Sequence, residues 1–326
     1  MRYFALLALL ISTLFGDTTL KIATYNVENL FDLQITKYRY KEYRPNTNAL
    51  WNKKHYKIKL QNIAKVIKDI DADIIALQEI GSLKALKDLR FELKKQGLYY
   101  QYFSIANKKP TSIKVALLSK VPFVYSKDLA VTHSYKYRNI LEAKFKINSQ
   151  NLYIFNNHWK AKSGPESMRI VSAKKLRARI EEIGLDKNII LLGDFNSDYE
   201  EYIKFKRKRK HNDTHGKTGI NHVLKTLEKG GDNLYNLWYQ KKEKERYSYI
   251  FKAKKEALDN IIVSQALLNP RGISYIKDSM GNFSKPYLFK KKHINRWQMS
   301  YGSVKKHKGK GYSDHLPVLA KFLVKD

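Results

Sequence analysis

Ile189-Ile190-Leu191-Leu192-Gly193-Asp194-Phe195-Asn196 is the stretch from which the architecture can be worked out. Four apolar residues in a row, two of them β-branched, predict a buried strand. Gly193 lets the backbone approach a neighbour closely, and Phe195 can turn inward. Asp194 and Asn196 would stand at the strand exit, where a carboxylate can orient water and an amide can donate to a phosphate oxygen. Asp-x-Asn alone is common turn chemistry, so the preceding strand makes the pattern informative.

Three further polar motifs follow apolar runs that predict strands, at residues 20–25, 73–77 and 152–156. The motifs are Tyr25-Asn26-Val27-Glu28-Asn29, Gln78-Glu79-Ile80 and Asn157-His158-Trp159. Two others begin the apolar runs 258–263 and 316–323 instead of following them. These are Leu258-Asp259-Asn260 and Ser313-Asp314-His315. All the motifs reach one end of the sheets only if the last two strands run the other way, which predicts mixed sheets.

Apolar residues at helical spacing predict three helices, over residues 56–67, 83–96 and 173–183. Ser82 is placed to cap the second of them, and Gly97 and Gly184 stand where the second and third would end. Short alternating or aromatic runs in 106–145 and 234–251 predict antiparallel strands. The predicted fold class is therefore α/β, with two packed mixed β-sheets and helices outside.

Hydrolysis of a phosphodiester needs a cation on the non-bridging oxygen, an activated water and stabilisation of the departing oxygen. Glu79 offers a carboxylate at a strand exit, and Asp314 is its natural second ligand. An all-oxygen site of this kind suits Mg²⁺, or Mn²⁺. Taken alone, Glu79 is better explained as a strand-end residue that caps the next helix.

Two histidines stand at the ends of the predicted strands. His158 follows one strand and His315 precedes another, and a pair of imidazoles facing one phosphate can act as base and acid. Asp259 could hold His315 in the required tautomer. Either histidine alone would more often be structural, and Asp259 is equally well explained as a turn or cap residue.

Together these stretches resemble the endonuclease/exonuclease/phosphatase superfamily, the deoxyribonuclease-like fold of nucleases, abasic-site enzymes, sphingomyelinases and inositol-phosphate phosphatases. Six motifs occur in one order over nearly the whole chain after residue 16. The resemblance implies a four-layered α/β sandwich and a divalent cation, usually Mg²⁺. On this resemblance the metal ligands are Asn26, Glu79 and Asp314, and the residues that contact phosphate are Asn26, Asn196 and His158. Asp194 would orient the attacking water. His158 and His315 would exchange protons, with Asp259 hydrogen-bonded behind His315.

The chain departs from that resemblance at two places. Deoxyribonuclease-like members give the histidine that matches His158 an acidic partner from a mid-chain strand, and residues 113–118 offer none. His158 is therefore expected to be a phosphate donor rather than a proton carrier. Family nucleases that grip a DNA groove often carry Arg shortly after the metal glutamate, where this chain has Gly81.

The chain is strongly basic, with 63 Lys and Arg against 30 Asp and Glu and a formal net charge of +33. Basic runs interleaved with Tyr and Phe occur at 204–210, 252–255, 290–293 and 305–310, which favours phosphate neutralisation and base stacking. Nucleic acid, DNA and also RNA, is the partner this predicts. An anionic membrane surface would attract the same charges, and any single run also fits a solvated face. The absence of cysteine excludes disulfides, thiolate metal sites and cysteine nucleophiles.

Residues 1–16 have the pattern of a secretory signal peptide, with Arg2 before an apolar stretch and Gly16 at the cleavage position. A buried first strand or an uncleaved anchor is the alternative. We expect a periplasmic or secreted protein, in which residues 17–326 form one domain because the motifs spread along all of it. A monomer with no obligate protein partner is expected.

The sequence supports three hypotheses. The first is a metal-dependent, non-specific endonuclease that leaves 5′-phosphate and 3′-hydroxyl ends. The second is a phospholipase C-type enzyme or inositol-phosphate phosphatase on the same fold. The third is a non-catalytic module that binds polyanions, although pure binding needs neither Glu79 nor His315.

Overall fold

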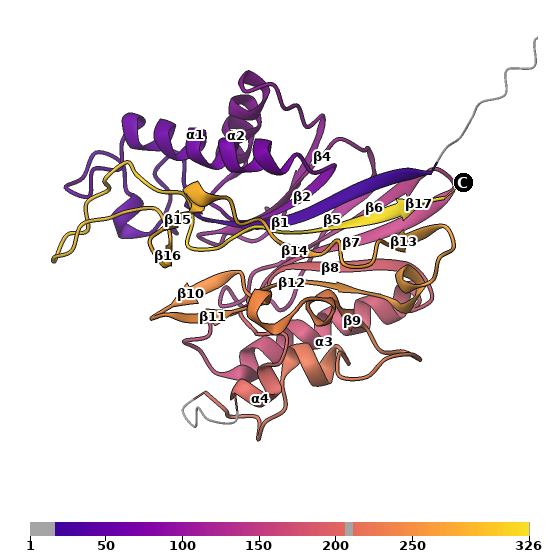
Figure 1. Cartoon of the computed structure of the whole chain (residues 1–326). Helices are drawn as coiled ribbons and strands as arrows, with labels where there is room; N and C mark the ends of the chain where they lie inside the picture. The colour runs from indigo at the N-terminus through magenta and orange to yellow at the C-terminus, as the bar shows by residue number, and fades with distance from the viewer. Residues whose placement is uncertain (1–16, 206–210, 326) are drawn as a thin grey trace, which may run out of the picture.

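The computed structural model describes residues 17–205 and 211–325. The predicted signal peptide, 1–16, lies outside the described residues, as do residues 206–210 of the basic run 204–210. The first and last strands of the described chain lie side by side, with Thr18 paired to Val324 at one end of the molecule (Figure 1).

The first sheet has seven strands, six of them in the order β13-β17-β1-β2-β4-β3, and β14 also pairs with β17. Its strands are β1 Thr18–Leu30, β2 Ile74–Ile80, β3 Tyr102–Ile105, β4 Lys114–Ser119, β13 Ile273–Tyr275, β14 Gly281–Asn282 and β17 Val318–Val324. β1 and β2 are parallel, whereas β17 runs antiparallel to β1 and β4 antiparallel to β2.

The second sheet has six strands in the order β5-β6-β7-β8-β12-β9. Its strands are β5 Phe123–Leu129, β6 Ile140–Ile147, β7 Gln150–His158, β8 Asn188–Asp194, β9 Tyr235–Asn236 and β12 Asp259–Val263. β7 and β8 are parallel, and β12 runs antiparallel to β8. Both sheets are mixed, as predicted from the placement of the last two motifs.

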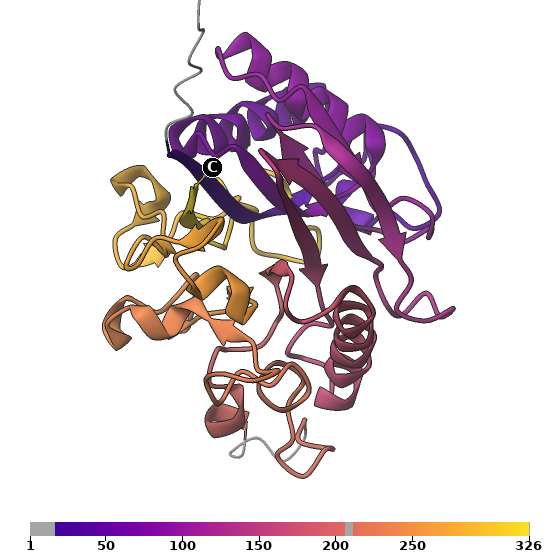
Figure 2. The ribbon, with the colours of Figure 1, turned by 90° about the vertical axis from the view of Figure 1, so that its right-hand side faces the viewer.

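Four layers result from packing helices on the outer faces of the two sheets (Figures 1 and 2). The helices are α1 Lys53–Ile70, α2 Leu83–Lys95, α3 Glu166–Ile183 and the short α4 Glu201–Phe205. One core joins α1 and α2 to the first sheet, a second lies between the sheets, and a third joins α3 to the second sheet. The α/β sandwich predicted from sequence is confirmed.

A buried polar layer ties the two sheets together next to their strand ends. Gln78 Nε2 on β2 donates to Asn156 Oδ1 on β7 at 2.7 Å and to Thr24 Oγ1 on β1 at 2.9 Å. Asn156 Nδ2 in turn donates to the carbonyls of Leu77 and Ala116. Since buried polar groups are costly unless they are paired, this layer allows one relative placement of the sheets.

The capping residues predicted for α2 and α3 agree with the structure, although α1 and α3 begin before the predicted residues 56 and 173. One predicted strand region is wrong. Ser82 Oγ accepts from Ala85 N at 3.0 Å, and Gly97 follows α2 with a φ of 85°. Residues 234–251 form mainly 3-10 helix and turn, with strand only at β9 and at the start of a hairpin. Asn236 Oδ1 accepts from Trp238 N at 3.1 Å and turns the chain so that Trp238 is buried.

Two small hairpins stand apart from the main sheets. One consists of β10 Tyr249–Phe251 and β11 Lys254–Glu256, and the other of β15 Phe289–Lys290 and β16 His293–Ile294. They lie beside each other at the end of the molecule opposite the chain ends (Figure 1). None of the helices in the described ranges is long and apolar enough to cross a membrane.

Candidate active site

The ends of β1, β2, β7 and β8 meet the start of β12 and the chain before β17 at one edge of the sandwich. The β1–β2 pairing shifts after Asn26, and the β2–β4 pairing shifts after Leu77. Within these shifts Glu28 has a φ of 50° and Glu79 a φ of 65°, values that non-glycine residues rarely adopt. Such bulges redirect side chains at the end of a strand, and strained backbone gathers at functional sites.

Gly193 brings β8 against β7 at this edge. Its φ is 124°, and a Cβ built on it would lie 2.1 Å from the carbonyl oxygen of Asn157. No other residue fits without moving the strands apart. The close approach sets the position of the next residue, Asp194.

Asp194 lies at the centre of the cluster. Its Oδ2 accepts from Asn26 Nδ2 at 3.0 Å, and its Oδ1 accepts from the backbone N of Asn196 at 2.8 Å. The same Oδ2 lies 3.5 Å from His158 Nε2 and 3.9 Å from His315 Nε2. The structure therefore brings together five residues that the motifs singled out.

Burial raises the pKa of Asp194 to about 7, with the charges of Asp259 and Glu79 adding to the rise and that of His315 opposing it. A carboxylate that binds its proton near neutral pH can both accept and release one there. Asp194 therefore has the proton affinity of a general base.

His315 is held by Asp259. Its Nδ1 lies 2.6 Å from Asp259 Oδ2, so the carboxylate accepts from Nδ1 and leaves Nε2 facing Asp194. Ser313 Oγ, which accepts from the backbone N of His315 at 3.2 Å, donates to the Asn26 carbonyl at 2.6 Å and fixes this loop to β1. Burial alone would lower the pKa of His315. The charge of Asp259 and its hydrogen bond outweigh burial and raise that pKa well above its usual range.

His158 has a different environment. Its Nε2 faces Asp194 and lies 3.9 Å from Glu79 Oε1, while its buried Nδ1 has no hydrogen-bond partner among the described residues. Burial, followed by the charges of Arg138 and His315, lowers the pKa of His158 well below its usual range. His158 is therefore neutral at physiological pH and can act as a hydrogen-bond donor, whereas His315 is charged.

The remaining predicted residues form the acidic side of the cluster. Glu79 Oε1 accepts from Asn26 Nδ2 at 3.2 Å, and Asp314 Oδ1 lies 4.0 Å from His315 Nε2. Burial and then the charge of Asp314 raise the pKa of Glu79, so the two carboxylates repel each other across the site. Among the described residues the Asn196 amide nitrogen makes one contact, Nδ2 to the carbonyl of Trp159 at 3.2 Å, which leaves its second amide hydrogen for a substrate oxygen.

The donor set fits a hard divalent cation. No group of three or more His, Asp or Glu side chains within the described ranges is close enough to enclose a metal by itself. Mg²⁺ does not need such an enclosure, because it keeps several waters and binds through one or two carboxylates together with substrate phosphate. Glu79 and Asp314 supply those oxygens, and the repulsion between the carboxylates favours a cation. Asn26 turns its amide nitrogen toward Glu79, and its amide oxygen accepts from the backbone N of Glu28 at 3.0 Å.

Comparison with known proteins agrees with this geometry. The profile described as the endonuclease/exonuclease/phosphatase family matches residues 21–324. The chain belongs to this family. Members of the endonuclease/exonuclease/phosphatase family are hydrolases of phosphoester bonds, and they generally use divalent metal ions.

Solved structures of the family share the fold. TDP2 of D. rerio, complexed with a single-strand DNA product, is 17% identical in sequence to this chain, with a TM-score of 0.60. The match covers 94% of this chain and 99% of the TDP2 chain. A humanized form of D. rerio TDP2 is 19% identical with a TM-score of 0.59, covering 93% and 98%. A mannosyl-6-phosphatase of Bacteroides thetaiotaomicron is 16% identical with a TM-score of 0.56, covering 93% and 99%. No curated protein sequence matches the chain.

The endonuclease/exonuclease/phosphatase site of this chain also includes residues that the sequence did not single out. Arg138 Nε donates to the carbonyl of His158 at 2.8 Å, and its charge partly opposes the rise that burial causes in the pKa of Glu79. Arg296 forms ion pairs with both Glu28 and Asp314, the latter at 3.2 Å. Glu28 belongs to a quoted motif and could have been chosen as a carboxylate. Neither arginine lies in a motif, and only the folded chain reveals them.

Proposed function

We propose that this protein is a divalent-metal-dependent nuclease that hydrolyses DNA, and also RNA, with little sequence preference, leaving 5′-phosphate and 3′-hydroxyl ends. One observation carries the proposal. Asp194, with a pKa near neutrality, lies between a charged histidine and a neutral one and beside the Glu79 carboxylate. The convergence of a base, two donors and a cation site suits phosphodiester hydrolysis.

Each side chain has a task in that reaction. Asp194 accepts a proton from the attacking water, and its hydrogen bonds from Asn26 and Asn196 fix its orientation. His315, charged and held by Asp259, donates from Nε2 to a phosphoryl oxygen as negative charge develops there. His158 donates a hydrogen bond while remaining neutral. A Mg²⁺ or Mn²⁺ held by Glu79 and Asp314 would supply Lewis-acid chemistry at the phosphate, and the departing 3′-oxygen takes its proton from solvent water.

The charge of the whole chain favours a polymeric substrate over a small phosphate ester. A net charge of +33 attracts a polyanion over long distances, and contacts to phosphates carry no sequence information. The DNA product bound by D. rerio TDP2 supports the same substrate class. The phosphatase among the similar structures makes phosphate monoesters the necessary comparison.

One digestion experiment tests the proposal. Supercoiled DNA, linear DNA, RNA, sphingomyelin, an inositol phosphate and mannose 6-phosphate are incubated with the protein in Mg²⁺, in Mn²⁺ and in EDTA. We expect both nucleic acids to be cut with either metal, no cutting in EDTA, and loss of cutting in His315→Ala. Phosphate release from the small esters or from sphingomyelin without nucleic-acid cleavage would support a phosphatase or phospholipase instead.

Export is proposed as well, on the pattern of residues 1–16. The chain expressed with its first 16 residues should be found outside the cytoplasm and begin at Asp17 when its N-terminus is sequenced. Recovery of the intact N-terminus from the cytoplasm would reject export and leave the nuclease proposal untouched.

A further inference from the structure

A groove of about 690 Å³ opens beside the proposed active site. One wall is the β10–β11 hairpin, and the other is the chain from β15 to residue 308. Glu28 and Asp314 line its inner end, so the groove is continuous with the acidic side of the active site. The two hairpins that bound it lie beside each other (Figure 1).

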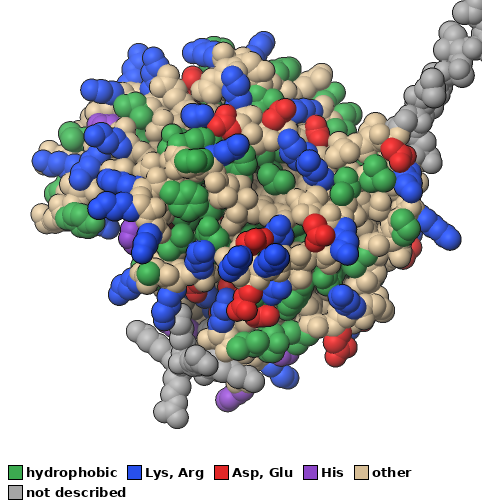
Figure 3. All heavy atoms as spheres, in the orientation of Figure 1, with side chains coloured by type: hydrophobic (Ala, Val, Ile, Leu, Met, Phe, Trp, Pro, Cys, Tyr) green, Lys and Arg blue, Asp and Glu red, His purple; other side chains and the backbone are tan. Residues whose placement is uncertain are grey.

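The groove presents positive charge that the protein does not neutralise. Lys290, Lys291, Lys305 and Lys308 line it and are exposed, and within the described ranges none has an ion-pair partner. Lys and Arg side chains gather over this end of the molecule (Figure 3). The carboxylates at the inner end face Arg296 instead. Phosphates in the groove would find donors whose charge is not already used.

The groove also exposes flat rings. Tyr301 is 100% exposed and Phe251, at the end of β10, is 55% exposed. Tyr249 lies deeper, with its ring centroid 4.9 Å from that of His315. Large aromatic side chains are usually buried, so rings held open beside lysines indicate a partner with planar groups as well as negative charge.

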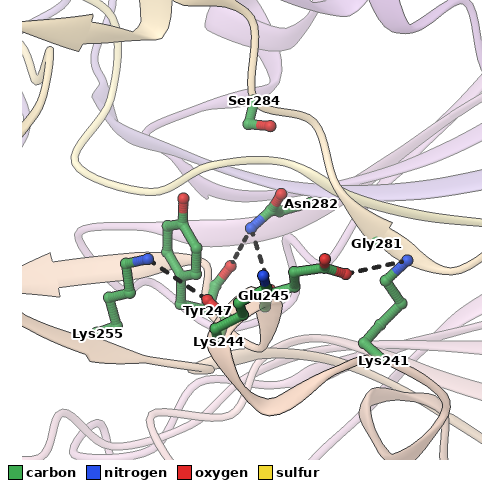
Figure 4. Close-up of a pocket in the computed structure, with 8 residues that line it drawn as sticks. All are labelled: Lys241, Lys244, Glu245, Tyr247, Lys255, Gly281, Asn282 and Ser284. Atoms are coloured by element: carbon green, nitrogen blue, oxygen red, sulfur yellow. Dashed lines mark hydrogen bonds and ion pairs between the residues drawn. The ribbon is translucent and has the colours of Figure 1, made fainter.

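A second cavity on the base of the same hairpin provides a contrast. It measures about 480 Å³ and is lined by Lys241, Lys244 and Lys255 (Figure 4). In this cavity most of the lysine charge already has a partner within the protein. Lys241 lies 3.5 Å from a Glu245 carboxylate oxygen, and Lys255 Nζ lies 4.2 Å from the centre of the Tyr247 ring. The larger groove is therefore the better site for a bound polyanion.

We infer that this groove binds an unpaired, single-stranded segment of nucleic acid next to the scissile phosphate. The inference rests on the proposed function and deepens it by naming the form of the substrate. Bases of a single strand are free to stack on Tyr301 and Phe251, while the lysines track the backbone. A duplex keeps its bases stacked inside and could use only the lysines.

Binding in EDTA tests the inference without catalysis. The ligands are a fluorescein-labelled oligothymidylate of about 12 nucleotides and a duplex of equal length, followed by fluorescence anisotropy. The variants are Lys290→Gln/Lys291→Gln/Lys305→Gln/Lys308→Gln and Phe251→Ala/Tyr301→Ala. The control is Lys146→Gln/Lys321→Gln, which removes exposed lysines of β6 and β17 outside the groove. Circular dichroism and melting temperature confirm that each variant is folded.

The single strand should bind more tightly than the duplex. The ring variant should weaken single-strand binding at least about tenfold and leave duplex binding nearly unchanged. The lysine variant should weaken both and flatten the plot of log affinity against log salt by about 3 units for the single strand. The control variant should weaken single-strand binding and duplex binding by less than about half of the loss seen with the lysine variant.

The outcomes separate this inference from the proposed function. If the groove variants lose oligonucleotide binding but Mg²⁺ brings no cleavage, the groove assignment stands and the nuclease proposal fails. Equal binding of duplex and single strand, or no effect of the ring variant, would overturn the groove assignment even if DNA is cut. Binding to vesicles containing phosphatidylserine, lost in the lysine variant and without oligonucleotide binding, would assign the groove to a membrane and overturn the inference.

Discussion

At the scale of single residues, the pair His315–Asp259 is the most informative contact in the site. Its 2.6 Å hydrogen bond joins two motifs that are 56 residues apart. Asp259→Asn removes the charge that keeps His315 protonated, so we expect a loss of about 100-fold in kcat on DNA. His315→Ala should lose about 10³-fold.

The matched control for this pair is Asp186→Asn. Asp186 is exposed and lies before β8, at the strand end opposite Asp194. Plasmid cleavage at saturating Mg²⁺ measures all three variants, and melting temperatures show whether each is folded. Unchanged kcat in Asp259→Asn would mean that His315 needs no carboxylate and that its proposed role is wrong.

Gly193 permits a prediction about stability. Gly193→Ala places a Cβ 2.1 Å from the Asn157 carbonyl oxygen in a backbone conformation with a φ of 124°. We expect the free energy of unfolding to fall by about 3 kcal/mol or more, because both overpacking and backbone strain contribute. Gly230→Ala separates the two effects, since Gly230 also has a positive φ, 85°, but nothing within 4 Å. It should cost about 1 kcal/mol by urea unfolding. Equal losses would show that contact with β7 is unimportant.

Site residues that lie within a sequence motif could be predicted, whereas site residues outside the motifs could not. Asp194, Asn196 and His315 could be chosen because short polar runs beside apolar strands are unusual. Arg138 and Arg296 act through contacts made by loops, and nothing in their neighbours marks them. The 3.5 Å approach of His158 to Asp194 could not be derived either, because it depends on the parallel register of β7 and β8, which pairs these two residues.

At the scale of elements, strands with continuous apolar runs were predictable and aromatic loops were not. The run that forms β8 could be predicted as a buried strand because its four consecutive apolar residues must all be buried. The stretch 234–251 has Tyr, Trp and Ile in short runs that suit a strand equally well, but Asn236 caps a 3-10 turn instead. A side chain that competes for backbone hydrogen bonds decides the local structure there, and the apolar pattern does not show it.

The chain between β16 and β17 offers a prediction at this scale. His307 fastens this segment to the rest of the molecule. Its Nδ1 accepts from Trp297 Nε1 at 2.7 Å, and its Nε2 donates to the Glu42 carbonyl at 2.8 Å. Burial lowers the pKa of His307 to about 4 from 6.5. The unfolded chain therefore binds a proton at higher pH than the folded chain does, so stability present above pH 6.5 is lost as pH falls toward 4.

Urea unfolding at pH 7 and near pH 4 checks this expectation. The difference in unfolding free energy between the native chain and His307→Gln should shrink by at most about 3 kcal/mol at the lower pH. His133→Gln is the control, because it removes an exposed imidazole. A constant difference for His307→Gln would mean that the imidazole is not kept neutral by the fold.

At the scale of the whole molecule, the charge favours nucleic acid, and the fold explains how that charge can be used. The sequence located the basic runs, but it could not show that those at 290–293 and 305–310 flank one groove beside Asp314. Their meeting depends on the path of the chain between β15 and β17, which has little regular structure. Charge composition predicts that the partner is a nucleic acid, whereas only the fold predicts that the bound segment is single-stranded.

Salt separates attraction for a polymer from chemistry at the site. Raising NaCl from about 50 to about 200 mM should lower kcat/KM on single-stranded DNA about 50-fold if about four phosphates are contacted. Hydrolysis of bis(4-nitrophenyl) phosphate, which carries one charge and cannot reach the groove lysines, should change less than about twofold. The lysine variant should show a shallower salt dependence on DNA and the same small salt dependence as the native chain on the small ester. An equal loss on both substrates would place the salt effect at the cation site, and the net charge would then have no part in substrate binding.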